Sequence, residues 1–188
     1  DERAHARELA RTVGARHVEV EFGEADFWEL LPRVAAAMDD PAADYACLPT
    51  FKLAMEARKE VKVILSGEGG DELFGGYGRY RHAMRPWPLS KPMRRSGTFD
   101  GLGVLREHVT DHWRAGIRAA ERAEAVHGRS RLQVAQAVDC ADWLPNDLLA
   151  KADRCLMANG IEGRVPFLDP VVAAFAFRLP DHLKVRKG

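Results

Sequence analysis

The sequence lacks the features that would assign it to several large classes of protein. Its apolar runs are short: "VVAAFAF", residues 171–177, is far below the roughly 20 residues of a membrane span. No signal peptide is visible. Lysine plus arginine equals aspartate plus glutamate, 28 against 28, so no overall field attracts nucleic acid or anionic lipid. We therefore expect neither a membrane protein nor a nucleic-acid-binding protein.

Cysteine is scarce as well. Cys47, Cys140 and Cys155 are odd in number and have no CxxC spacing, which argues against a disulfide framework and against a zinc site. We interpret them as buried free thiols in a reducing compartment, which favours a cytoplasmic location.

What is present fits one ordinary globular domain. At 188 residues the chain is long enough for a proper core. It begins at "DERAHARELA", without an initiator Met and already inside a helical pattern, and it stops abruptly at "KVRKG". We therefore expect a fragment of a longer protein.

The first 80 residues alternate between helical and strand patterns. Apolar spacing predicts helices over residues 2–13, 24–38 and 49–59. Alternation in "RHVEVEF" predicts a half-buried strand ending at residue 22, and the dense run "VKVIL", residues 61–65, predicts a strand buried on both faces. This order indicates an α/β fold with a mainly parallel sheet.

Beyond Tyr80 the sequence predicts a mainly helical part. The proline-rich stretch over residues 85–97 is typical of a connection, and we assign no chemistry to the residues between it and Asp142. A helix is predicted from Asp147 to about residue 159. The charged loop "IEGRVPFLD" follows, and its apolar neighbours indicate that its charges are partly buried and paired.

A glycine-rich, acidic stretch follows the strand predicted at residues 61–65. "SGEGGDELFGGY", residues 66–77, matches neither the dinucleotide fingerprint nor the Walker A loop. It nevertheless stands where α/β sheets bind ligands, and its glycines let backbone N–H groups approach a ligand closely. Glu68, Asp71 and Glu72 offer hard oxygen ligands that Mg²⁺ accepts together with phosphate. The alternative is a tight turn whose acids merely cap the following helix.

Downstream, three charged residues share one side of the predicted helix. Asp147, Lys151 and Arg154 are spaced four and three apart, opposite an apolar stripe. The alternative is an ion-paired surface of no chemical importance.

The two segments together resemble the synthetase domain of the glutamine-dependent asparagine synthetase family. The family signature SGEGxDExFGGY corresponds to "SGEGGDELFGGY", and LLxKxDRxSMAxxxExRxPFLD corresponds to "LLAKADRCLMANGIEGRVPFLD". The "DDPAAD" stretch likewise resembles the family's DEPxAD segment. The similarity covers nearly the whole chain and is weakest between residues 83 and 138.

The resemblance implies a fold of the adenine-nucleotide α-hydrolase (PP-loop) type and a two-step reaction. ATP, with Mg²⁺, adenylates the side-chain carboxylate of aspartate. Ammonia, supplied from glutamine by an N-terminal glutaminase domain of the parent chain, then displaces AMP to give asparagine. A homodimer is compatible with this resemblance. Two alternatives stay open: an amide-forming relative that acts on another carboxylate, in a peptide or antibiotic precursor, and a non-catalytic domain for nucleotide binding or assembly.

The resemblance also implies roles for individual residues. Asp71 would coordinate Mg²⁺, Glu68 would orient or deprotonate ammonia beside the acyl-adenylate, and Asp147 would line the substrate pocket. The residues implied to contact the nucleotide are Ser66, Gly67 and Gly69. Those implied to position substrate or to support the site are Lys151, Asp153, Arg154, Glu162 and Arg164.

The sequence also departs from the family pattern. It contains no SGGxDS loop, which grips pyrophosphate in the family, and Leu156 stands where Ser is usual. We interpret residues 1–188 as a partial synthetase domain, in which residues 1–80 form a nucleotide-binding α/β portion lacking its first loop and residues 81–188 form a mainly helical portion. We expect the isolated chain to be inactive.

Overall fold

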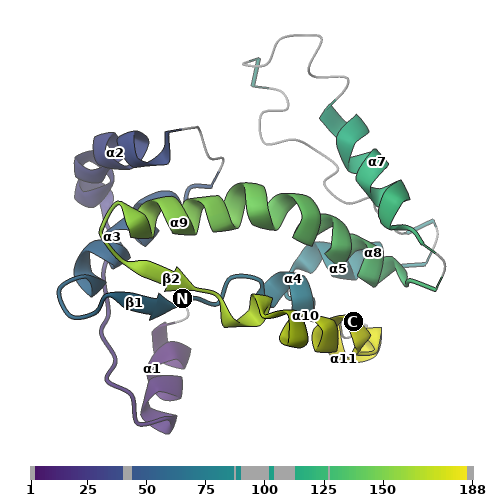
Figure 1. The fold of residues 1–188 in the computed structure, drawn as a ribbon, viewed down its shortest axis with the longest axis horizontal. Coiled ribbons are helices and arrows are strands. Elements are labelled where there is room, and N and C mark those ends of the chain that lie inside the picture. The colour runs from purple at the N-terminus through teal and green to yellow at the C-terminus, as the bar shows by residue number, and fades with distance from the viewer. Residues whose placement is uncertain are drawn as a thin grey trace.

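The computed structural model describes residues 3–39, 44–86, 88–89, 102–103, 113–126 and 128–185. The proline-rich stretch predicted to be a connection lies largely outside these residues. The elements, labelled in Figure 1, are α1 (Arg3–Thr12), α2 (Glu24–Met38), α3 (Cys47–Ala57), β1 (Val63–Leu65), α4 (Gly70–Phe74), α5 (Gly78–Ala83), α7 (Trp113–Glu124), α8 (Arg131–Val138), the π-helical segment η1 (Asp139–Leu149), α9 (Ala150–Met157), β2 (Glu162–Arg164), the 3₁₀ turn η2 (Pro166–Leu168), α10 (Pro170–Arg178) and α11 (Asp181–Lys184).

The sheet within the described residues joins two segments that are far apart in the sequence. β1 pairs in parallel with β2, with Ile64 opposite Gly163. The α/β character and the parallel pairing are as predicted, but burial of β1 on both faces is wrong, because Val63 is 48% and Leu65 74% exposed. α9 packs closely on β2, where a Cβ on Gly163 would lie 2.6 Å from Leu156 Cδ1.

The segment 161–169 is more ordered than the loop predicted from its sequence. It contains β2 and η2, because after the helix ends the chain forms a strand that pairs in parallel with β1. Glu162 and Arg164 do pair with each other, but both side chains are more than half exposed, so the predicted burial is wrong. Residues two apart on a strand point to the same face, which here is the solvent face.

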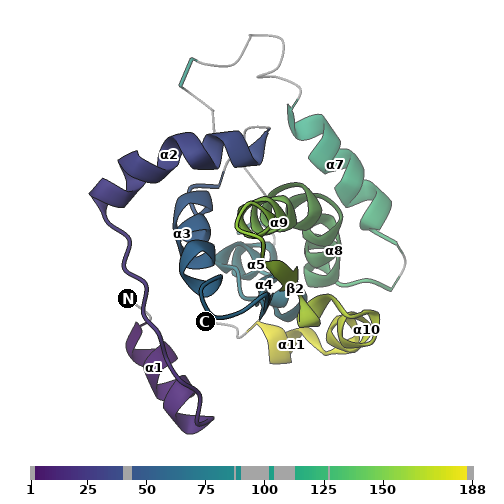
Figure 2. The ribbon, with the colours of Figure 1, turned by 60° about the vertical axis from the view of Figure 1, so that its left-hand side comes forward.

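The N-terminal segment contains a second correction. α1 and α2 form as predicted, and Gly14 ends α1 at φ +67°. The strand predicted between them does not form: residues 15–23 contain no strand, and Val18 is 60% exposed. An alternating pattern makes a strand only beside a neighbour that completes its hydrogen bonds, and no described segment fills that place. Figure 2 shows α1 and this segment set apart from the helices around α9.

One long helix organises the rest of the molecule. α8, η1 and α9 are continuous from Arg131 to Met157, so the predicted start at Asp147 is wrong. The wider π-helical turns accommodate Pro145, which in a regular helix would remove a hydrogen bond and clash. The end was predicted correctly, with Gly160 at φ +68°.

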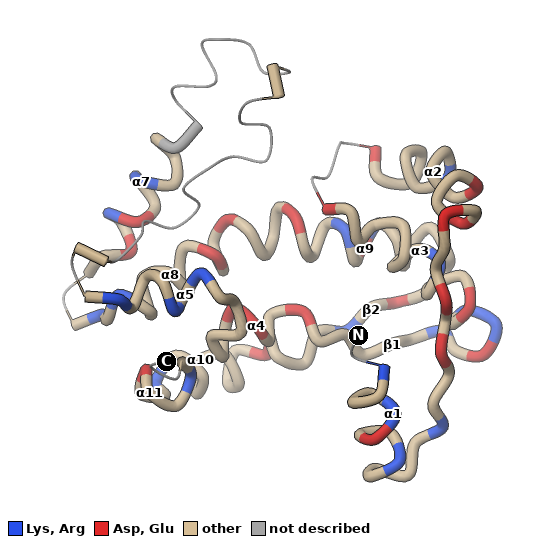
Figure 3. The backbone as a smooth tube through the Cα atoms, turned by 180° about the vertical axis from the view of Figure 1, so that it is seen from behind, with Lys and Arg blue, Asp and Glu red and all other residues tan. Residues whose placement is uncertain are grey.

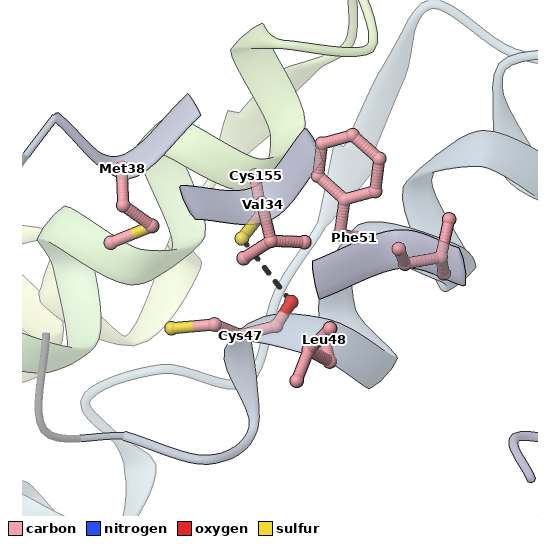
Figure 4. Close-up of a cluster of buried hydrophobic side chains, with 7 residues drawn as sticks. Val34, Met38, Cys47, Leu48, Phe51 and Cys155 are labelled. Atoms are coloured by element: carbon pink, nitrogen blue, oxygen red, sulfur yellow. Dashed lines mark hydrogen bonds between the residues drawn. The ribbon is translucent and has the colours of Figure 1, made fainter. Parts of the chain in front are cut away.

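Apolar residues of α2, α3 and α9 form one cluster of the core, drawn in Figure 4. Its buried members are Leu30, Val34, Met38, Cys47, Leu48, Phe51 and Cys155. The Cys155 thiol donates a hydrogen bond to the Cys47 carbonyl oxygen at 3.4 Å.

All three cysteines are free, with Cys47 and Cys155 buried and Cys140 partly buried. Burial raises the pKa of Cys140 and of Cys155 to about 12. None of the described helices is both long enough and apolar enough to span a membrane.

Candidate active site

The glycine-rich stretch turns the chain sharply from β1 into α4. The Ser66 amide donates to the Arg164 carbonyl oxygen at 2.8 Å and so extends the β1–β2 ladder by one bond. The Gly70 amide donates to the Gly67 carbonyl oxygen at 3.1 Å, which closes a tight turn. Gly69 stands in that turn at φ +88°, a conformation that a residue with a Cβ rarely adopts.

This turn packs directly against the end of the second motif. A Cβ on Gly69 would lie only 2.3 Å from Leu168 Cδ2, and a Cβ on Gly70 would lie 3.3 Å from the Phe167 ring. The rings of Phe74 and Phe167 meet edge to face, 5.8 Å apart. Both motifs therefore build one structure at the carboxyl end of β1.

A cluster of three charged residues lies beside the turn. Lys151 Nζ of α9 donates to Asp44 Oδ2 at 2.8 Å and lies 3.5 Å from Glu68 Oε1. The side chains are 7% exposed for Lys151, 13% for Asp44 and 22% for Glu68. One ammonium group thus contacts two carboxylates from different segments, and of the three side chains Glu68 is the most exposed to water.

The protonation equilibria follow from this arrangement. Burial raises the pKa of Glu68, because the attraction of Lys151 only partly offsets the loss of solvent and because Glu72 and Asp44 add repulsion. Burial opposes the charged form of Lys151 too, but the hydrogen bond to Asp44 and the charge of Glu68 outweigh it, so the pKa of Lys151 is raised. The lysine is therefore a firmly held cation.

The other two acids assigned a direct role lie in different surroundings. Asp147 is buried, one helical turn before Lys151. Asp71 is exposed on α4, and its carboxylate rests against Gly76, where a Cβ would be 1.8 Å from Oδ1. No three His, Cys, Asp or Glu side chains converge as a metal cage within the described ranges. An exposed single carboxylate fits the way Mg²⁺ is commonly bound, by one or two carboxylates together with phosphate oxygens.

A second polar cluster lies deeper, between α4, α5 and the long helix. Asp139 is fully buried and accepts hydrogen bonds from the Tyr80 hydroxyl at 2.7 Å and from Arg79 Nε at 3.0 Å. Glu72, also buried, accepts from the Tyr77 hydroxyl at 2.6 Å, so it does more than cap a helix. Burial raises the pKa of Tyr80, which keeps its hydroxyl a donor.

The remaining predicted site residues lie away from the Lys151 cluster. Arg154 Nη1 donates to Asp39 Oδ2 at 2.9 Å on the surface, and Asp153 is exposed. Glu162 and Arg164 stand on the exposed face of β2. Their roles as positioning or supporting residues stay predictions.

The family model described as asparagine synthase matches residues 1–188, the entire chain. The chain belongs to the asparagine synthase family. A putative glutamine-hydrolyzing asparagine synthetase of Mycobacterium tuberculosis is 38% identical over 95% of this chain. The glutamine-hydrolyzing asparagine synthetase 1 of Bacillus subtilis is 34% identical over 97% of this chain, and the glutamine-hydrolyzing asparagine synthetase of Bos taurus is 26% identical over 97%. The chain spans about a third of the length of the first two relatives, 33% and 35%.

Within this asparagine synthase domain, sequence reasoning missed several polar residues. Asp44 belongs to the "DDPAAD" stretch, which carried the family resemblance but suggested no role. In the structure, two aspartates of this stretch bind the two cations of α9: Asp39 binds Arg154, and Asp44 binds Lys151. Asp139 lies in a stretch to which no chemistry was assigned, and its sequence neighbours gave no signal of a role.

Proposed function

We propose that the chain is part of a glutamine-hydrolysing asparagine synthetase and contributes to the site that adenylates and amidates aspartate. The observation that supports this most is the meeting of both motifs at the carboxyl end of β1, where the glycine turn, Glu68 and Lys151 lie together. Parallel α/β sheets bind ligands at this edge. The proposal includes a PP-loop type of fold for the complete domain, which the parallel β1–β2 pair supports.

The chemistry has two group transfers. An oxygen of the aspartate side-chain carboxylate attacks the α-phosphorus of ATP, and pyrophosphate leaves with the bonding electrons. The lone pair of ammonia then attacks the acyl carbon, the bond to AMP breaks, and the surplus proton of the nitrogen passes to a base or to water. Mg²⁺, when bound, offsets the charge on the pyrophosphate.

The residues implied by the family resemblance have the following tasks in this scheme. Gly67 and Gly69 would let the backbone of the turn approach the nucleotide, with open space at Gly67, where a Cβ would meet no atom within 4 Å. The Ser66 hydroxyl would add a hydrogen-bonding group. Glu68 is half-buried with one face toward water, a position suited to orienting or deprotonating ammonia. Asp71 would hold the metal from the exposed side of α4, and Asp147 would line the aspartate pocket.

Ammonia would come from a glutaminase domain elsewhere in the parent protein, and the parent protein would form homodimers. We also assign the reaction to the cytoplasm, a location that the three free thiols support. Gel filtration and assays of glutamine-dependent against ammonia-dependent synthesis would test these points separately.

Two substitutions in the complete protein test the assignment. Asp71→Asn is expected to weaken Mg-ATP-dependent pyrophosphate release by about a hundredfold, because the metal loses a charged ligand. Glu68→Gln is expected to lower amide formation by at least about tenfold, because it removes a base. Glu29→Gln, at an exposed position of α2, serves as the control. Parental rates of asparagine synthesis in both site variants would show the assignment to be wrong.

The unmodified proteins give a coarser test. We expect the complete protein to make asparagine and the isolated chain of residues 1–188 to make none. A complete protein that binds ATP without releasing pyrophosphate would favour a non-catalytic domain. Faster turnover of a carboxylate other than aspartate would favour an amide-forming relative.

A further inference from the structure

We propose that Asp44 is a positioning residue of the amide-forming step: it holds the Lys151 ammonium away from Glu68, so that the Glu68 carboxylate stays available to ammonia. The inference rests on the proposed function and adds a residue to which neither sequence motif assigned a task.

The distances show which carboxylate holds the lysine. Lys151 Nζ is 2.8 Å from Asp44 Oδ2, a full charge-assisted hydrogen bond, and 3.5 Å from Glu68 Oε1, the outer limit of such a bond. An ammonium group is a point charge on a flexible stem, so it moves toward whichever acceptor is left to it. Asp44 therefore determines the contact that Lys151 makes with Glu68.

Asp44 is itself fixed. Its Oδ1 accepts a hydrogen bond from the Ala46 amide at 2.8 Å, and its backbone oxygen accepts from the Cys47 amide at 3.2 Å. One carboxylate oxygen is thus tied to the start of α3, and the other faces Lys151. A group bound at both oxygens cannot follow the lysine toward Glu68.

Glu68 is left with the weaker contact and the more open position. Besides Lys151, the charges of Glu72 and Asp44 act on Glu68, and Glu72 is engaged by the Tyr77 hydroxyl. A close ion pair with Lys151 would occupy an oxygen of Glu68 and lower its basicity. Without Asp44 as the competing acceptor, we expect that close pair to form.

The same chain offers a matched control. Asp39 and Arg154 join the same two segments through a 2.9 Å contact, but their side chains are 72% and 50% exposed. The substitution Asp39→Asn therefore removes an ion pair of the same stretch without changing a contact of Glu68.

The experiment uses the complete protein and measures the two half-reactions separately. Asp44→Asn is expected to lower ammonia-dependent asparagine formation at least about tenfold and to raise the KM for ammonia, with aspartate-dependent ATP–pyrophosphate exchange within about twofold of parental. Asp44→Glu should restore part of the loss, and Asp39→Asn should change neither rate. An equal loss in both half-reactions, or no loss, would overturn the proposal.

Two further measurements separate this inference from the proposed function. In a Lys151→Met background, Asp44→Asn should cost nothing more, because no ammonium remains to redirect. A crystal structure of Asp44→Asn should show Lys151 Nζ within about 3 Å of Glu68. An unchanged separation contradicts the positioning role whatever the protein synthesises, whereas an unmodified protein that makes no asparagine contradicts the proposed function alone.

Discussion

The long helix from Arg131 to Met157 bears two charge clusters that differ in burial and in balance. Figure 3 shows its charged positions spread along the helix, with α4 beside it. Near its start, Asp139 is fully buried and is bound by Arg79 and Tyr80. Near its end, Lys151 is shared by two carboxylates, and both of them are partly exposed to solvent, Glu68 more than Asp44.

The difference separates a structural cluster from a candidate catalytic one. At Asp139 one acid meets one cation and a neutral donor, and the Arg79 guanidinium is covered by the Tyr77 ring at 3.8 Å. Because Asp139 is fully buried, a ligand has no direct access to its carboxylate. At Lys151 the contact with Glu68 is loose, and burial raises the pKa of Glu68. An incompletely satisfied, accessible acid is where chemistry can occur.

Removal of the buried acid should have the largest effect on stability. Asp139→Ala is expected to lower the free energy of unfolding by about 3–5 kcal/mol, because it leaves the Arg79 charge and the Tyr80 hydroxyl without their acceptor. Urea unfolding measures the loss. Asp153→Ala, at an exposed position of the same helix, should change stability by less than about 0.5 kcal/mol. Equal effects of the two substitutions would remove the distinction between the clusters.

Removal of the shared cation should cost less. Lys151→Met is expected to lower the free energy of unfolding by about 1–3 kcal/mol, because Asp44 and Glu68 then repel each other. The loss is limited because both side chains are partly exposed to water and because burial raises the pKa of Glu68. The loss should shrink on acidification as Glu68, whose pKa is raised by burial, takes up a proton. Urea unfolding at pH 7 and at pH 5 measures it. A loss as large as that of Asp139→Ala would mean that the Lys151 cluster is equally structural.

Local patterns predicted the helices well and the strands less well. α2 was predicted with its observed bounds because its apolar stripe meets α3 and α9 within the chain. The strand expected to end at residue 22 failed because a strand needs a neighbour that its own sequence does not specify. β2 was missed for the same reason, since its pairing with β1 depends on a segment distant in sequence.

For the candidate site, the sequence indicated the reactive stretches but not their partners. Glu68 and Lys151 were both singled out from their motifs, and the structure brings them together. Asp44 was not singled out, because a pairing between two loops and a helix leaves no periodic signal. The burial of Glu72 and Asp139 was equally invisible, since it depends on how α4, α5 and the long helix pack.

The smallest expected effect is the contribution of Glu68 ionisation to the free energy of unfolding, and its sign can be tested. Because burial raises its pKa in the folded protein, the folded state binds this proton more tightly than the unfolded state does, and ionised Glu68 lowers stability as pH rises through that pKa. Glu68→Gln, which cannot ionise, should therefore exceed the parent in stability at pH 7 by less than about 1 kcal/mol. The advantage should disappear near pH 4, where the parent is protonated as well. Unfolding midpoints at the two pH values measure this difference. A variant less stable than the parent at pH 7, with the gap closing at pH 4, would show that the attraction of Lys151 outweighs the cost of burying Glu68. In that case the charged acid would stabilise the fold in both clusters.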